Sequence, residues 1–154
     1  MRDVVLELLK EVKDPEIPTL NIVDLGLVEA IRFDRGRLEI DLLPTFTGCP
    51  ALDIIRAEVM EKARTLPQVE EVAVRFRLSP AWSTDRITEA GRAQLKAFGI
   101  APPQPPKAKP AEGVTCPYCG SSDAVMEAAF GPTRCRSIYY CRNCRNPFEK
   151  MKEL

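Results

Sequence analysis

Residues 27–43, LVEAIRFDRGRLEIDLL, decide the fold of the first part of the chain. The runs 27–33 and 37–43 are rich in apolar residues, and Asp-Arg-Gly separates them. Two such runs around a short polar turn with glycine predict a β-hairpin. In the second run leucine and isoleucine alternate with acidic residues, so we expect one buried face and one solvated face.

Helical periodicity flanks this hairpin on both sides. Upstream, one face of a predicted helix carries Val4, Val5, Leu8, Leu9 and Val12. That helix should end before Pro15 and Pro18, which cannot continue it. Downstream, residues 50–66 are predicted to be helical. The buried stripe expected there is Leu52, Ile55, Val59, Ala63 and Leu66.

A third strand and a last helix complete the first unit, which we place at residues 1–100. The strand is predicted from the alternation of Val72, Val74, Phe76 and Leu78 with polar or small residues. The helix covers residues 88–98, with Gly99 as its stop. The order helix, strand, strand, helix, strand, helix predicts a small α/β (α+β) sandwich with helices on one face of a mixed sheet.

Composition limits the classes of function. The chain has 154 residues, a formal net charge of zero, six cysteines and no histidine. No apolar run approaches the roughly 18 residues of a membrane span, so we expect a cytoplasmic protein without membrane contact. Without histidine the chain cannot use Ser-His or Cys-His catalysis. Cysteines in a reducing compartment suggest metal binding or reactivity before disulfides.

The second unit is predicted to be a zinc ribbon. A proline-rich linker, residues 101–110, precedes it, and residues 111–154 are too few for a sufficient core. Two CxxC pairs, with a β-hairpin predicted between them, supply four thiolates for a structural zinc ion. These ligands are Cys116, Cys119, Cys141 and Cys144. An iron–sulfur site or a redox pair would use the same thiols.

The ribbon carries further chemistry-bearing residues. We interpret Cys135 either as a small buried residue, or as an alternate ligand or reactive thiol. Basic and aromatic side chains also gather there: Arg134, Arg136, Arg142, Arg145, Tyr139, Tyr140 and Phe148. Because acidic residues balance this charge, we expect a solvated or protein-docking face and not a nucleic-acid site.

Cys49 is the one cysteine of the first unit and lies in the stretch PTFTGCPA. Pro50 suits the first position of a helix, so the helix N-terminus would favour the thiolate of Cys49. This makes Cys49 a candidate ligand for iron or a cluster; a buried structural cysteine is the other interpretation. One cysteine cannot hold a whole cluster, which points to transient carriage with ligands from elsewhere. Residues expected nearby are Asp14, Glu16, Asp24, Thr47 and Gly48.

Several stretches together resemble a known family. DPEIPTLNIVDLGLV (14–28), PTFTGCPA (44–51) and LSPAWSTDRITEAGRAQLKAFGIAPP (78–103) resemble the iron–sulfur assembly domain family that includes the SufT-like proteins. The ribbon stretch FGPTRCRSIYYCRNCRNPFEKMK (130–152) resembles the members that accompany phenylacetyl-CoA epoxidase, a multicomponent oxygenase of aerobic phenylacetate breakdown.

The resemblance implies a non-enzymatic maturation factor that assembles iron–sulfur or di-iron centres. It places the metal-carrying cysteine at Cys49, the DPE motif at Asp14, Pro15 and Glu16, and the zinc ligands at the CxxC cysteines. The implied partners are the oxygenase and reductase components of the epoxidase. Two alternative functions stay open: a permanent docking subunit without catalysis, and a thiol enzyme acting on CoA thioesters. Among partners, a second copy of the chain in a homodimer is also open.

Overall fold

The computed structural model describes residues 1–45, 51–103, 114–132 and 135–152. The chain divides into two compact units, residues 1–91 and 92–154. Each unit is described by itself.

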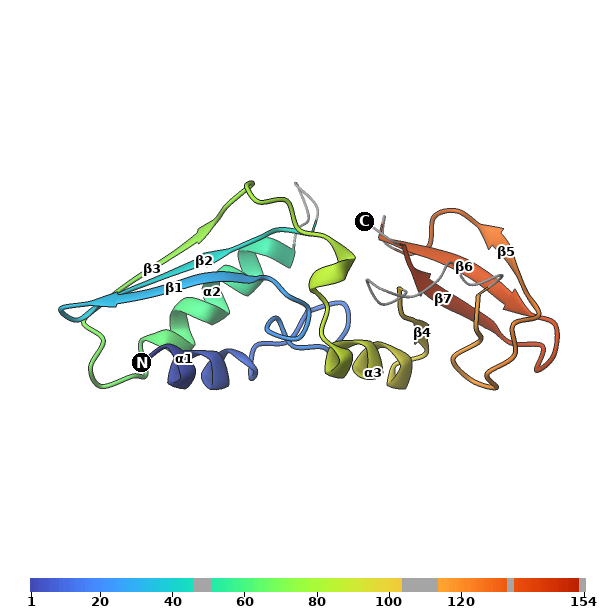
Figure 1. The fold of residues 1–154 in the computed structure, drawn as a ribbon, viewed down its shortest axis with the longest axis horizontal. Coiled ribbons are helices and arrows are strands. Elements are labelled where there is room, and N and C mark those ends of the chain that lie inside the picture. Colours follow the sequence, from blue (N-terminus) through green and yellow to red (C-terminus); the bar gives the residue numbers. More distant parts are fainter. Residues whose placement is uncertain (46–50, 104–113, 133–134, 153–154) are drawn as a thin grey trace. The chain divides into compact units, whose positions relative to one another are not determined.

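The first unit contains a three-stranded mixed sheet with helices on one face (Figure 1). In chain order its elements are α1 (Arg2–Leu9), β1 (Val28–Asp34), β2 (Arg37–Leu42), α2 (Ala51–Ala63), β3 (Glu71–Phe76) and the short 3-10 helix η1 (Thr84–Arg86). The strand order is β1-β2-β3; β1 and β2 are antiparallel, and β2 and β3 are parallel. The predicted α/β class and element order are confirmed.

The hairpin forms because its turn residues accept left-handed backbone. Arg35 and Gly36 have φ values of 47° and 81°, and Asp34 pairs with Arg37. Positive φ at both central residues defines the type I′ turn, whose twist matches that of the strands it joins. This geometry aligns Leu38 and Ile40 on the face that the helices cover.

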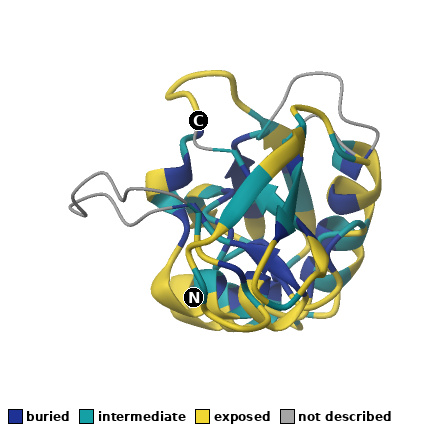
Figure 2. Cartoon of the chain, turned by 90° about the vertical axis from the view of Figure 1, so that its right-hand side faces the viewer, coloured by how far each residue is buried: buried dark blue, intermediate teal, exposed yellow. Residues whose placement is uncertain are grey.

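The core of the first unit lies between the sheet and the helices. Buried residues of the strands and helices include Val5, Leu9, Leu38, Ile40, Leu42, Ile55, Val59 and Ala63. Figure 2 shows buried and exposed residues on opposite sides of the helices. The prediction of burial is wrong for two residues: Val4 is 55% exposed, and Leu78, which follows β3, is 70% exposed. Leu52 is half-buried, because Ala51 instead takes the buried position at the start of α2, and Leu66, which follows the end of α2 at Ala63, is also half-buried.

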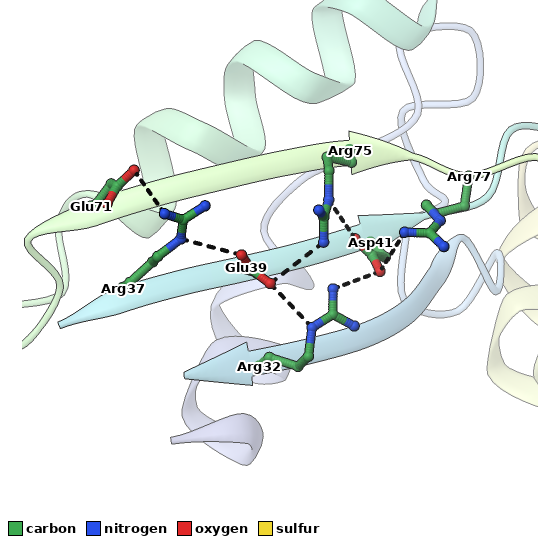
Figure 3. A network of polar contacts seen from close by, with 7 residues as sticks. All are labelled: Arg32, Arg37, Glu39, Asp41, Glu71, Arg75 and Arg77. Atoms are coloured by element: carbon green, nitrogen blue, oxygen red, sulfur yellow. Dashed lines mark hydrogen bonds and ion pairs between the residues drawn. The ribbon is translucent and has the colours of Figure 1, made fainter. Parts of the chain in front are cut away.

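The face of the sheet opposite the helices carries a network of ion pairs (Figure 3). Asp41, predicted to be solvated, is only 4% exposed. Arg32 donates to it from Nη2 at 2.7 Å and Arg75 from Nε at 3.1 Å, and Arg77 lies 3.8 Å away. The long arginine side chains cover the carboxylate, so the alternating pattern alone gave the right face but the wrong exposure.

The second unit is built on a four-stranded sheet in the order β4-β7-β6-β5. Helix α3 (Glu89–Ala97) leads into it, and the strands are β4 (Ile100–Ala101), β5 (Ala124–Ala128), β6 (Arg136–Cys141) and β7 (Pro147–Met151). β5 and β6 form the predicted hairpin. Strands β7 and β4 were not predicted; β4 pairs in parallel with β7 and contains Ala101, the first residue of the expected linker.

Two residues of the expected solvated face of the ribbon are in fact buried. Arg136 is 5% exposed and donates to Glu149 Oε2 at 2.6 Å. Phe148 belongs to the core of the unit and stacks on Tyr139 with ring centroids 5.8 Å apart. The basic and aromatic residues therefore do not form one continuous surface platform. Arg134 lies outside the described residues.

Candidate metal centre

Four cysteines of the second unit converge on one point. The sulfur atoms of Cys116, Cys119, Cys141 and Cys144 all lie within 4.8 Å of one another. Across the two CxxC pairs, the Sγ atoms of Cys116 and Cys144 are 3.8 Å apart, and those of Cys119 and Cys141 are 3.6 Å apart. Cys116 and Cys141 are buried, whereas Cys119 is exposed, so the site lies at the edge of the small core.

These distances fit one tetrahedral metal ion. Four thiolates about 2.3 Å from a central ion form a tetrahedron whose edges measure about 3.8 Å. The observed separations are far longer than the roughly 2.05 Å of a disulfide bond, so the thiols are not paired covalently. A multi-iron cluster places iron and sulfide between its thiolates and needs them farther apart. The geometry thus favours a single ion.

Both cysteine pairs use the same local backbone geometry. In the first, the N–H of Gly120 donates to the carbonyl of Cys116 at 2.9 Å, and the N–H of Cys116 donates to Ser121 at 2.8 Å. In the second, Arg145 N–H donates to Cys141 at 2.8 Å, and Cys141 N–H donates to Asn146 at 3.0 Å. We call these turns knuckle 1 (residues 116–121) and knuckle 2 (residues 141–146).

The residue after the second cysteine of each knuckle has left-handed backbone. Gly120 has a φ of 76° and Arg145 a φ of 60°. This conformation turns the chain back so that the following carbonyl can accept from the first cysteine. Glycine adopts this conformation without steric cost, whereas arginine adopts it only at a steric cost.

Side-chain amides support the sulfur atoms from outside. Asn143 Nδ2 lies 3.5 Å from the Sγ of Cys119, and Asn146 Nδ2 lies 3.5 Å from the Sγ of Cys144. Hydrogen bonds from Asn143 and from the backbone of Ser121 lower the pKa of Cys119 to about 6. Such donors stabilise thiolates, the form that binds metal. Sequence reasoning missed these two asparagines; their place within and just after CRNC was the available signal.

Cys135 lies outside the four-cysteine cluster. It is half-buried and sits one residue before β6, not within the strand as predicted. Its carbonyl accepts a hydrogen bond from the N–H of Lys152 at 2.8 Å. Among the described residues, the cluster is complete without it.

The candidate site at Cys49 falls in residues 46–50, outside the described part of the chain, together with Thr47 and Gly48. Among the described residues, a hollow of about 180 Å³ is lined by Pro44, Thr45, Arg77, Leu78, Ala81 and Trp82. Of these, Pro44 and Thr45 lie just before the segment in the sequence. Trp82 is held there by its indole N–H, which donates to the carbonyl of Leu25 at 3.0 Å.

Two of the acidic residues expected near Cys49, Asp14 and Asp24, serve turns and a helix start. Asp14 Oδ1 accepts the backbone N–H groups of Glu16 at 2.8 Å and of Ile17 at 3.1 Å. Asp24 Oδ1 accepts from Thr88 Oγ1 at 2.8 Å, just before α3. These contacts are those of turn or cap residues, in which an aspartate oxygen accepts from nearby backbone or hydroxyl groups. The role of Asp14 and Glu16 at a metal site stays a prediction.

No helix in the described ranges is long and apolar enough to span a bilayer.

Two known families match separate parts of the chain, one within each compact unit. Residues 2–74 match the family described as iron-sulfur cluster assembly protein. Residues 101–152 match the family described as PaaD zinc beta ribbon domain. The fold and the four-cysteine site therefore define a class: an iron–sulfur assembly domain that carries a C-terminal zinc-ribbon domain.

A relative that spans both parts gives the particular family. The chain is 38% identical to an Escherichia coli protein named as a component of 1,2-phenylacetyl-CoA epoxidase, over 94% of this chain and 88% of that protein. The chain belongs to the PaaD family. A Bacillus subtilis Fe-S protein maturation auxiliary factor is 31% identical and covers 62% of this chain and 93% of its own length.

Solved structures match the first part of the chain. A domain of unknown function from Bacillus anthracis has a TM-score of 0.57 and 29% identity, and covers 60% of this chain and 89% of its own. A conserved hypothetical protein from Thermotoga maritima has a TM-score of 0.54 and 28% identity, with coverages of 62% and 93%.

Proposed function

We propose that this protein is a non-enzymatic maturation factor for the phenylacetyl-CoA epoxidase system. In this proposal Cys49 transiently carries iron or an iron–sulfur cluster toward an oxygenase or reductase component. The observation that supports this proposal is that one chain combines an assembly-factor domain with the ribbon of an epoxidase component. The Bacillus subtilis relative, named as a maturation auxiliary factor, supports the first half of the proposal.

We assign zinc to the four-cysteine site, in a structural role. Four thiolates in a closed tetrahedral set leave no open position for a substrate, which is typical of structural zinc. The ion would hold the two knuckles together and supply folding free energy that the small second core lacks. The ribbon would then act as the part that docks on the epoxidase components.

A permanent docking subunit is the second candidate. The name of the Escherichia coli relative, which makes it a part of the epoxidase, favours it. In that case the chain would stay bound to the oxygenase at a fixed ratio, and Cys49 would be a structural residue.

The test is to measure zinc, iron and acid-labile sulfide in protein purified without oxygen, for the natural chain, Cys49→Ala and Cys135→Ala. We expect about one zinc per chain in all three, because the four ligands are untouched. Iron and sulfide should be lost in Cys49→Ala and kept in Cys135→Ala, which removes a thiol outside the four-cysteine cluster. The natural chain should also restore activity to metal-depleted epoxidase at less than one chain per complex.

Two outcomes contradict the proposal. Iron and sulfide absent from the natural chain even after reconstitution would remove the carrier role. A stable complex at a fixed ratio, with no rescue of depleted epoxidase, would favour the docking subunit. Iron in place of zinc in all three proteins would overturn only the zinc assignment.

A further inference from the structure

The outer edge of β3 differs from the other strand edges that the structure describes. Proteins blunt exposed edges with short strands, bulges or proline. β1 and β5 each have a register irregularity, and β4 has only two residues. β3 pairs with β2 in regular register over all six residues and contains no proline or glycine.

Backbone groups of β3 point toward this open edge. The N–H groups of Glu71 and Arg77 donate to Gly36 and Leu42 on the β2 side. Alternate residues of a parallel strand bond to the same neighbour, so Val72 and Val74 direct their N–H and C=O groups outward. These are the groups that a further strand would use.

The side chains that precede Ala73 in β3 are complementary to those that follow it. We propose that β3 pairs with β3 of a second copy of this chain, antiparallel, with a two-fold axis at Ala73. This register places Val72 opposite Val74 of the second copy, and the outward backbone groups of both then form paired hydrogen bonds. It also places Glu71 opposite Arg75 of the second copy, twice by symmetry.

Charge and size both fit this register. Glu71 and Arg75 are 62% and 45% exposed in their side chains, so each can reach a second partner. Opposite charges directly across two strands are favourable. At the axis, Ala73 lies opposite Ala73 of the second copy. These two side chains approach each other more closely than any others in the pairing, so a larger residue would collide there. The ion-pair network of Figure 3 would then continue across both sheets.

The test is sedimentation of the full chain, loaded with zinc, over a range of concentrations. We expect a reversible monomer–dimer equilibrium. Ala73→Arg should raise the dimer Kd by about tenfold or more, because like charges meet at the axis. Within one chain the new arginine faces Glu39, its neighbour on β2, so the fold should tolerate it. Ala30→Arg is the matched control, since Ala30 lies on the same face beside Asp41 but on β1.

A second pair of variants tests the backbone. Val72→Pro removes an outward N–H that the single chain does not need, and should abolish the dimer. Val72→Ala keeps that N–H and should retain it. In hydrogen exchange, the amides of Val72 and Val74 should become protected as concentration rises. A monomer at all concentrations, equal effects of Ala73→Arg and Ala30→Arg, or exchange independent of concentration would each overturn the proposal.

Discussion

The carboxylate of Asp41 is buried although it lies on the face of the sheet opposite α1 and α2. Burial by itself raises the pKa of Asp41, but hydrogen bonds from Arg32 and Arg75 outweigh it and leave the pKa below its ordinary value. A carboxylate with a lowered native pKa stabilises the fold fully above its unfolded pKa, near 3.9. This contribution disappears as the pH falls through the lower, native pKa.

We predict that Asp41→Asn lowers the free energy of unfolding by about 1–3 kcal/mol at neutral pH, because charged hydrogen bonds are lost from a buried position. The difference from the natural chain should begin to shrink as the pH falls below about 4, where the carboxylate of the unfolded chain binds protons. It should vanish below the lower, native pKa, where the folded carboxylate is protonated as well. Urea unfolding at several pH values measures both effects. Asp34→Asn, the same change at an exposed ion pair, should cost less than about 0.5 kcal/mol. A constant difference across all pH values would contradict this account of Asp41.

Sequence reasoning succeeded for side chains whose environment is local and failed where the environment comes from other strands. The CxxC spacing already places two thiols of each knuckle together. The burial of Asp41 depends on Arg75 and Arg77, which are more than thirty positions away in the sequence, and on the register of β3. The sequence pattern within β2 therefore could not predict that Asp41 is buried.

At the scale of elements, the two knuckles have the same turn geometry but different sequences. Both need left-handed backbone after the second cysteine, but only knuckle 1 has glycine there. A Cβ built on Gly120 meets nothing within 4 Å, so a substitution at this position changes backbone strain and little else.

We predict opposite effects at the two equivalent positions. Gly120→Ala should destabilise the ribbon by about 1–2 kcal/mol, the cost of left-handed backbone for a residue with a Cβ. Arg145→Asn should stabilise it by a few tenths of a kcal/mol, since asparagine tolerates this conformation better than arginine. Thermal unfolding of the zinc-loaded chain, followed by tyrosine circular dichroism, measures both. Changes of the same sign would contradict the equivalence of the knuckles.

The elements themselves were predictable where periodicity was long or a turn was specific. The α-helices, the first hairpin, β3 and the β5–β6 hairpin follow from such signals, whereas the short helix η1 was not predicted. β4 is two residues long and next to prolines, and β7 begins at a proline, so neither carries a strand pattern of its own. Both exist because β6 provides an edge on which β7 pairs, and β7 then provides one for β4.

At the scale of the whole molecule, each unit has its own core and its own spectroscopic reporter. The single tryptophan, Trp82, is buried in the first unit. All three tyrosines, Tyr118, Tyr139 and Tyr140, belong to the second. The core of the second unit contains two of the four clustered cysteines, so a metal bound there would be part of its packing.

We predict that a strong zinc chelator unfolds the second unit and leaves the first folded. Structural zinc contributes on the order of 10 kcal/mol of apparent binding free energy, which a core of this size cannot replace. The tyrosine signal in near-ultraviolet circular dichroism should collapse, while the emission maximum of Trp82 stays unchanged. Cys116→Ser should behave like the chelated chain, and Cys135→Ser like the natural one. Loss of both signals together would show that the units fold as one.

A gene fragment that begins after the proline-rich segment would encode a ribbon without β4. The edge of β7 would then be left bare, and Ala101 would be missing from the cluster that surrounds Cys116 and Cys141. Bare strand edges invite aggregation. Recombination that moved this ribbon onto another protein would therefore have to carry the residues upstream of the prolines with it; the family match begins at residue 101, within β4.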